Sequence, residues 1–271
     1  MTTLQKIIKY LAIALALFLT VSIIEGLLGI VGVIGGLMDR EPTVKETETY
    51  TVTTDIDRLE IEIGAADFKI EQAAEFSVKS NLKNLTVKEQ NGKLIIKETN
   101  HLSVRTEKTF LTLSIPSGKT FERVELTTGA GRLTVEHLSA DTLKLVLGAG
   151  EATVNELNAT TAADISGGAG RITISGGALH NLDLEMGVGE LNLTSALTGD
   201  CELELGVGQS NITVLGDKEA YRLDLQKGLG SLTVDGVNIS NSLALSGGRH
   251  SLTVHGGVGA IYVDFAKSAK Y

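Results

Sequence analysis

The stretch TGAGRLTVEHL, Thr128 to Leu138, recurs along the chain with small changes. The first glycines of successive copies lie 19, 20, 19, 19, 22 and 20 residues apart. Self-similarity at a fixed period of this length is typical of a solenoid, in which each repeat forms one coil. The later copies are LGAGEATVNEL from Leu147, GGAGRITISG from Gly167, MGVGELNLTSA from Met186, LGVGQSNITVL from Leu205, KGLGSLTVDG from Lys227 and a degenerate GGRHSLTVHG from Gly247.

Apolar residues alternate with polar ones on both sides of each GxG. Leu143, Leu145 and Leu147 precede one copy, and Ala152 and Val154 follow it. Such alternation is typical of a strand with one buried face. The two rows are out of phase by one residue, and a glycine corner permits the bend that keeps both rows inward. We therefore predict an all-β fold, a β-solenoid with two short strands and GxG corners in each coil of about 20 residues.

Glycines at the corners are the predicted structural site residues, and the middle Ala, Val or Leu of each corner is expected to point inward. Thr or Asn recurs five residues after each first glycine, which predicts an outward ladder of side chains across stacked coils. The corner glycines are Gly129, Gly131, Gly148, Gly150, Gly168, Gly170, Gly187, Gly189, Gly206, Gly208, Gly228 and Gly230.

Residues 1–38 are predicted to hold a membrane anchor, one N-terminal transmembrane helix that precedes the solenoid. The run from Ile7 to Ile24 carries no charge except Lys9, and it is long enough to span most of a bilayer core of roughly 30 Å. No cleavage site typical of a signal peptide follows it. Because Lys6 and Lys9 favour a cytoplasmic amino end, we expect a single-pass protein of the cell membrane with an extracytoplasmic C-terminal domain.

Glu25 is the one ionisable residue within the rest of the apolar stretch, and Gly26, Gly29 and Gly32 follow it at intervals of three. An intramembrane charge marks a functional site, and small residues allow helices to pack closely. These residues could therefore bind another membrane protein. The alternative is that the span ends at Ile24 and the glycines form a flexible exit from the membrane.

The remainder of the chain divides by composition into a linker and a domain. Residues 39–50 are polar and are predicted to form the linker, and residues 51–271 are predicted to form the solenoid domain. An Asn91-Gly92 hairpin signal lies in the first part. This part is expected to cover the open end of the stack, because a bare edge would promote aggregation. The predicted sections are 51–120 (first and irregular), 121–256 (regular coils) and 257–271 (terminal coil and tail).

Motifs of common catalytic and cofactor sites are missing from the sequence. The GxG copies lack the third glycine, the following helix and the distant acid of a dinucleotide site, and there is no GxSxG or HExxH. The histidines are scattered, and Cys201 lies in an apolar alternation typical of a buried thiol. A net charge of −9 provides no basic face for nucleic acid. We expect no enzyme activity, no cofactor, no metal and no nucleic-acid partner.

The segment LTLSIPSGKTFERVELTTGAGRLTVEHLSADTLKLVLGAGEATV, from Leu111 to Val154, resembles the bacterial adhesin-like family, a domain of unknown function. The likeness lies in the repeat rhythm and in the strand that Pro116 closes, and it extends over roughly 55–265. It implies a β-solenoid, commonly tethered to the envelope of Gram-positive bacteria. It transfers no functional residue, since the later corners lack the Asp that often follows the family's glycine.

Taken together, these features predict a non-catalytic, membrane-anchored, extracytoplasmic β-solenoid that serves as an interaction or stress-response module of the cell envelope. Its partners would be the membrane and a membrane protein or envelope component. Two alternatives remain: a regulatory membrane subunit that pairs through its transmembrane helix, and a surface adhesin.

Overall fold

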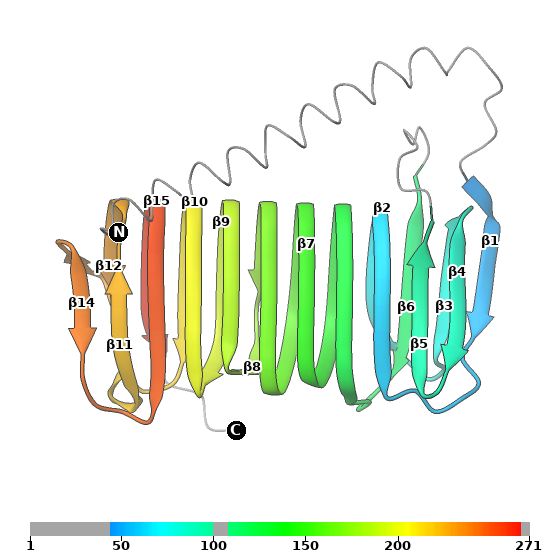
Figure 1. The fold of residues 1–271 in the computed structure, drawn as a ribbon, viewed down its shortest axis with the longest axis horizontal. Coiled ribbons are helices and arrows are strands. Elements are labelled where there is room, and N and C mark those ends of the chain that lie inside the picture. The colour runs from blue at the N-terminus through cyan, green and yellow to red at the C-terminus, as the bar shows by residue number, and fades with distance from the viewer. Residues whose placement is uncertain (1–43, 100–107, 267–271) are drawn as a thin grey trace, which may run out of the picture.

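A computed structural model describes residues 44–99 and 108–266. It is an all-β stack in which neighbouring coils run side by side from β1 at one end to β14 at the other (Figure 1). The sheet order is β1-β3-β6-β2-β7-β8-β9-β10-β15-β11-β14. The strands are β1 (Val44–Thr51), β2 (Arg58–Ala73), β3 (Ser77–Leu82), β4 (Leu85–Gln90), β5 (Lys93–Glu98), β6 (Phe110–Pro116), β7 (Phe121–Ile174), β8 (Gly177–His180), β9 (Leu182–Thr198), β10 (Asp200–Leu215), β11 (Tyr221–Gln226), β12 (Leu229–Val234), β13 (Val237–Ile239), β14 (Ser242–Leu245) and β15 (His250–Ala266), with one 3-10 turn, η1 (Lys218–Ala220).

Each regular coil has three sides rather than the predicted two. A first arm precedes the glycine corner, a second arm follows it, and a short third side returns the chain to the next coil. Strand β8 belongs to this third side, where it pairs in parallel with β7 at Leu157 and with β9 at Leu197. The third side buries only one or two apolar residues per coil, so its alternation is too short to be recognised in the sequence.

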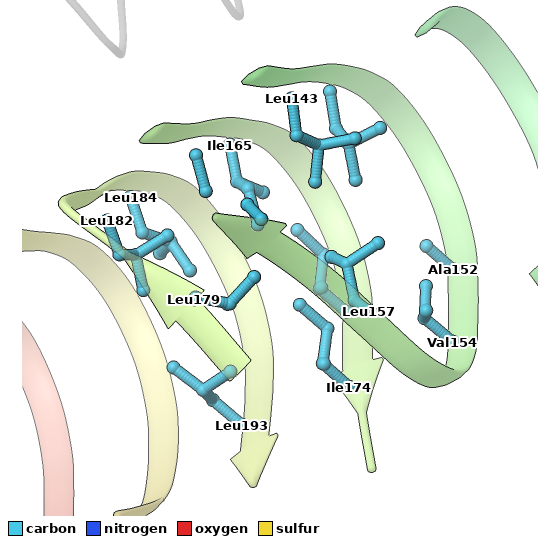
Figure 2. Close-up of a cluster of buried hydrophobic side chains, with 14 of the residues drawn as sticks. Leu143, Ala152, Val154, Leu157, Ile165, Ile174, Leu179, Leu182, Leu184 and Leu193 are labelled. Atoms are coloured by element: carbon cyan, nitrogen blue, oxygen red, sulfur yellow. The ribbon is translucent and has the colours of Figure 1, made fainter. Parts of the chain in front are cut away.

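The core consists of apolar columns, because parallel pairing places equivalent residues of successive coils next to each other. Leu203 of β10, for example, lies between Leu184 of β9 and Val254 of β15. Complete burial of one such side chain contributes about 1.5–3 kcal/mol. Figure 2 shows the interior filled from the first arms (Leu143, Ile165, Leu182 and Leu184), the second arms (Ala152, Val154, Ile174 and Leu193) and the third side (Leu157 and Leu179).

At the β1 end, hairpins continue the sheet beyond the first coil, β2. Strands β5 and β6 pair in parallel with the two arms of β2, while β4 and β3 add to them in antiparallel fashion. The expected linker over 39–50 is wrong for its described part, because Val44–Thr51 forms β1, antiparallel to β3. Its side chains are exposed from Glu46 to Thr51. Charge on an edge strand hinders pairing with other chains.

The last coil of the chain is not the last coil of the stack. Strand β15 pairs in parallel with β10 on one side and with β11 and β12 on the other, so it lies between coils that precede it in sequence (Figure 1). Its corner is Gly257-Val258-Gly259, in register with Gly206-Val207-Gly208 of β10. The degenerate copy from Gly247 therefore does not form the corner of this coil, and the prediction of 257–271 as the terminal coil is wrong for its described part.

Identical tetrapeptides explain this error. SLTV occurs at 231–234, where it follows a corner as a second arm, and again at 251–254, where it precedes one as a first arm. Both arms require the same alternation of apolar and polar residues, so the local pattern cannot distinguish them.

Candidate interaction surface along the corners

The predicted corner glycines form two columns along the stack. In the column of third-position glycines the backbone lies at positive φ, from +118° at Gly131 to +145° at Gly208. In the other column φ is ordinary, but the coils approach closely: a Cβ on Gly129 would lie 2.5 Å from the carbonyl oxygen of Gly64. Real Cβ atoms do not approach oxygen this closely, so the stacking distance itself requires glycine.

Between these columns, the middle residues of the corners point outward, contrary to the inward expectation. Leu229 is 70 % exposed, Val188 45 % and Val207 38 %. The inside of the corner is already filled by the flanking residues of the two arms, such as Met186 and Leu191, which are buried. We call the resulting line the corner ridge; along the stack it consists of Ala130, Ala149, Ala169, Val188, Val207, Val258 and Leu229.

Charged side chains of alternating sign flank the ridge on the second arm. Arg171 lies 2.9 Å from Glu190 and 3.5 Å from Glu151, and Arg132 lies 3.6 Å from Glu151 and 4.0 Å from Asp67. These five residues, which we call the ion-pair ladder, come from successive coils. Hydrogen bonds from Asn192 and Arg171 lower the pKa of the Glu190 carboxyl, so this end of the ladder is ionised at neutral pH.

The first arms present an acidic face on the other side of the ridge. Glu185 lies beside Glu204 in the parallel register. The carboxylates of this face are those of Asp164 on β7, Asp183 and Glu185 on β9, and Glu202 and Glu204 on β10. Partial burial raises the pKa of Glu185, and the charges of Glu204, Asp183 and Asp164 raise it further. Lys144 lies 3.0 Å from Asp164 at one end of this face.

The cavities under the corners are too small for a ligand. One of about 20 Å³ lies below Gly148 and Gly168, and another of about 10 Å³ lies below Gly206 and Gly257. Each has space for about one water molecule. The cavity of about 20 Å³ is the larger because Gly167 has no side chain at the inward position that Leu or Met occupies in the other coils. The candidate site is therefore the surface formed by the ridge and its charged flanks.

Some predicted site residues lie outside the described residues. These are Glu25, Gly26, Gly29 and Gly32, together with the whole predicted transmembrane helix. Within residues 44–99 and 108–266, no helix is long and apolar enough to cross a membrane. In the same part of the chain, no group of three His, Cys, Asp or Glu side chains has the geometry to hold a metal ion. Cys201 is buried, and burial raises the pKa of its thiol.

The predicted column of Thr and Asn is present only in part beside the ladder. Thr173, Asn192 and Asn211 lie in register on successive coils, and Asn211 donates to Asn192 at 2.7 Å. Tyr262 interrupts the column between Asn211 and Thr233, and Thr253 lies outside it, on a first arm beside Glu202. Sequence reasoning missed the ridge, although its residues occupy the middle position of every GxG. The side chain at this middle position becomes larger along the sequence, from Ala to Val and then Leu, and this trend is visible in the repeats.

Comparison with solved structures finds similar folds in bacterial proteins. A proposed adhesin from Bacteroides fragilis NCTC 9343 is 15 % identical, with a TM-score of 0.49, 80 % of this chain covered and 95 % of that chain. A proposed cell adhesion protein from Clostridium sporogenes ATCC 15579 is 11 % identical, with a TM-score of 0.38 and 82 % and 99 % covered. A proposed lipid-binding protein from Parabacteroides distasonis ATCC 8503 is 13 % identical, with a TM-score of 0.41 and 80 % and 96 % covered.

No curated protein matches the sequence. A family model does match, and it extends from the first coil across the corners of β7, β9 and β10 to the start of β15. Since the match covers residues 56–251, the chain belongs to the Toastrack DUF4097 family.

Proposed function

We propose that the chain is a membrane-anchored, extracytoplasmic interaction module of the bacterial envelope. The observation that carries this proposal is the corner ridge, an exposed apolar line along the stack beside ordered charges. Apolar patches of this kind mark contact sites for proteins or membranes. The apolar stretch from Ile7 to Ile24 supports the anchor.

The geometry favours a large partner over a small molecule. A ligand pocket normally encloses several hundred Å³, whereas the cavities under the corners hold about 20 and 10 Å³. Parallel coils repeat every ~4.8 Å, so the ridge offers regularly spaced contacts to an extended protein, a glycan or a lipid surface. A surface adhesin, or an envelope-stress accessory protein, would use the same face.

A regulatory membrane subunit is the second candidate function. It is favoured by Glu25 and the glycines at 26, 29 and 32, which would pair with a helix of another membrane protein. In that case the solenoid would act as a scaffold or sensor, and loss of the ridge would leave the complex intact.

Photo-crosslinking in intact cells tests the proposal. A benzophenone side chain is placed at Val207 on the ridge or, as the matched control, at Glu202 on the acidic face of the same coil. A product specific to Val207 is expected, and it should persist when Glu25, Gly26, Gly29 and Gly32 are replaced by Leu. Equal crosslinking at the two positions, or none at either, would contradict the proposal that the corner ridge is the contact surface. Loss of the product in the Leu variant would favour the regulatory subunit.

Protease treatment of the same cells tests the topology. A tag at the C-terminus should be removed without lysis if the solenoid is extracytoplasmic. A tag that stays protected until lysis would contradict that localisation and would exclude the adhesin role.

A further inference from the structure

A serine, a histidine and a glutamate meet on the third side of the stack, away from the ridge. The Oγ atom of Ser139 lies 2.9 Å from Nε2 of His137, and Nδ1 of the same ring lies 3.1 Å from Oε2 of Glu156. His137 and Ser139 are two residues apart on β7, so their side chains share one face. Glu156 is 19 residues later, in the adjacent coil, at the position next to His137.

Asn158 completes the cluster and fixes its orientation. The backbone N–H of Ala178 donates to Oδ1 of Asn158 at 2.9 Å, so the amide nitrogen faces the other way. That nitrogen donates to Oγ of Ser139 and to Oε1 of Glu156, both at 3.2 Å. A hydrogen bond from Nδ1–H of His137 to the Glu156 carboxylate leaves Nε2 as an acceptor for the hydroxyl proton.

This connectivity matches that of a hydrolytic serine site. A nucleophile is recognised by a hydrogen-bonded base that a third group orients, and an Asn amide can stabilise the oxyanion that forms. The hydrogen bonds from Asn158 and His137 lower the pKa of the Glu156 carboxyl, which keeps it charged at neutral pH. His137 is 27 % exposed at its side chain and Glu156 53 %, so solvent and substrate can reach the cluster.

We propose that Ser139 is a nucleophile activated by His137 and that this cluster hydrolyses esters of small acyl groups. This activity is independent of the interaction role of the ridge. The cavities described above lie at the corners and provide no acyl pocket here. The substrate would therefore be an unhindered acyl ester, such as an acetyl ester carried on an exposed polymer.

The reaction balances with water as the only co-reactant. Oγ of Ser139 forms a bond to the acyl carbon and its proton passes to Nε2 of His137. The N–H group of Asn158 that donates to Oγ before the reaction turns to the oxyanion as the new bond forms. The bond from the acyl carbon to the leaving oxygen then breaks, and the proton on Nε2 passes to that oxygen. In the second half, Nε2 takes a proton from water while the water oxygen bonds to the acyl carbon. The bond from that carbon to Oγ then breaks, the carboxylic acid leaves, and the proton on Nε2 returns to Oγ of Ser139.

A fluorophosphonate probe tests the nucleophile in the full-length chain. The serine oxygen displaces fluoride from phosphorus, and mass spectrometry locates the label. We expect the label on Ser139, hydrolysis of p-nitrophenyl acetate by the same protein, and loss of both in Ser139→Ala. His137→Ala and Asn158→Ala should each slow labelling about 100-fold. Ser175→Ala, which removes an exposed serine outside the cluster, should change neither the labelling rate nor the rate of ester hydrolysis.

Three results would overturn the proposal: no label on Ser139, no ester hydrolysis, or labelling of the His137→Ala variant at the original rate. His137→Asn serves as a second variant if the alanine change disturbs folding, which circular dichroism would reveal. Unchanged labelling in that variant would count equally against the proposal.

Glu156 is a positioning residue, and its role has a spectroscopic signature. The ¹⁵N shifts of His137 should show a protonated Nδ1 in the original chain and a changed tautomer ratio in Glu156→Gln. Glu156→Asp should restore both the tautomer and the labelling rate. Identical ¹⁵N shifts and labelling rates in the original chain and Glu156→Gln would exclude this role.

Discussion

At the residue scale, the corner glycines perform two different tasks. The third-position glycines, such as Gly189 at φ +140°, occupy a backbone region that side chains rarely adopt, and they also contact the neighbouring coil. The first-position glycines need only the close approach. The first constraint acts within the residue's own backbone and the second between stacked coils, and both recur in every coil, which is why the GxG repeat is so regular in the sequence.

Substitution of Gly189 by Ala should lower the free energy of unfolding by about 3 kcal/mol, because strain at positive φ and a clash with the carbonyl group of Gly170 add together. Gly236 is the matched control. It has φ +74°, but a Cβ added there would meet no atom within 4 Å, so Gly236→Ala should cost only about 1 kcal/mol. Urea unfolding measures the free energy of unfolding of both variants. Equal losses in the two would contradict the claim that contact with the neighbouring coil adds to the cost at Gly189.

At the element scale, side chains join successive coils and attach the edge strands. Glu89 of β4 accepts hydrogen bonds from the hydroxyl of Tyr50 and the backbone N–H groups of Thr53 and Thr54 at 3.0, 3.0 and 2.7 Å. A further hydrogen bond comes from the Thr54 hydroxyl. One carboxylate thus holds the segment that connects β1 to the first coil.

Acid should weaken this attachment. The hydrogen bonds lower the pKa of Glu89 from 4.5 to about 2, with the Thr54 hydroxyl as the largest cause. Because the folded-state pKa is below the unfolded value, the stabilisation is complete above pH ~4.5 and is lost as the pH falls towards 2. The Tm difference between the original chain and Glu89→Gln should therefore shrink over this range. A difference independent of pH would contradict the assignment.

The ion-pair ladder should contribute little and should respond to salt. Arg171 is 52 % exposed and lies between Glu151 and Glu190. Arg171→Met should reduce the free energy of unfolding only slightly at low ionic strength, and 1 M NaCl should abolish the difference. Arg222→Met is the control, since Asp200, 3.6 Å away, is the one carboxylate among the described residues that pairs with Arg222, and Arg222 is 61 % exposed. A loss that persists in 1 M NaCl would argue for packing instead.

At the scale of the whole molecule, the sequence predicts the coil but not the assembly of coils. The all-β solenoid follows from alternation and from glycine sterics, both of which act within about 20 residues. The outward direction of Val207 depends on which side chains already fill the corner, and the meeting of Ser139 with Glu156 depends on the stacking register. Neither is encoded in a local pattern. The predicted anchor lies outside the described residues and stays a prediction.

The position of β15 has the largest structural consequence. Because this coil lies between β10 and β11, its formation completes the interior of the stack, and the coil of β11 and β12 is attached to the rest through it. The place of β11 and β12 in the sheet therefore depends on β15, since both pair with β15.

Disulfide mapping tests most directly whether β15 lies between β10 and the coil of β11 and β12. Asn211, Tyr262 and Thr233 occupy one column, with Tyr262 paired to each of the other two. In a Cys201→Ala background, cysteine pairs 211/262 and 233/262 should oxidise readily, because neighbouring strands lie about 4.8 Å apart. The pair 211/233 spans about twice that distance and should stay reduced, since a disulfide requires Cα atoms within about 7 Å. Efficient formation of the 211/233 bridge, without the 211/262 bridge, would show that the coils stack in chain order and would contradict the account.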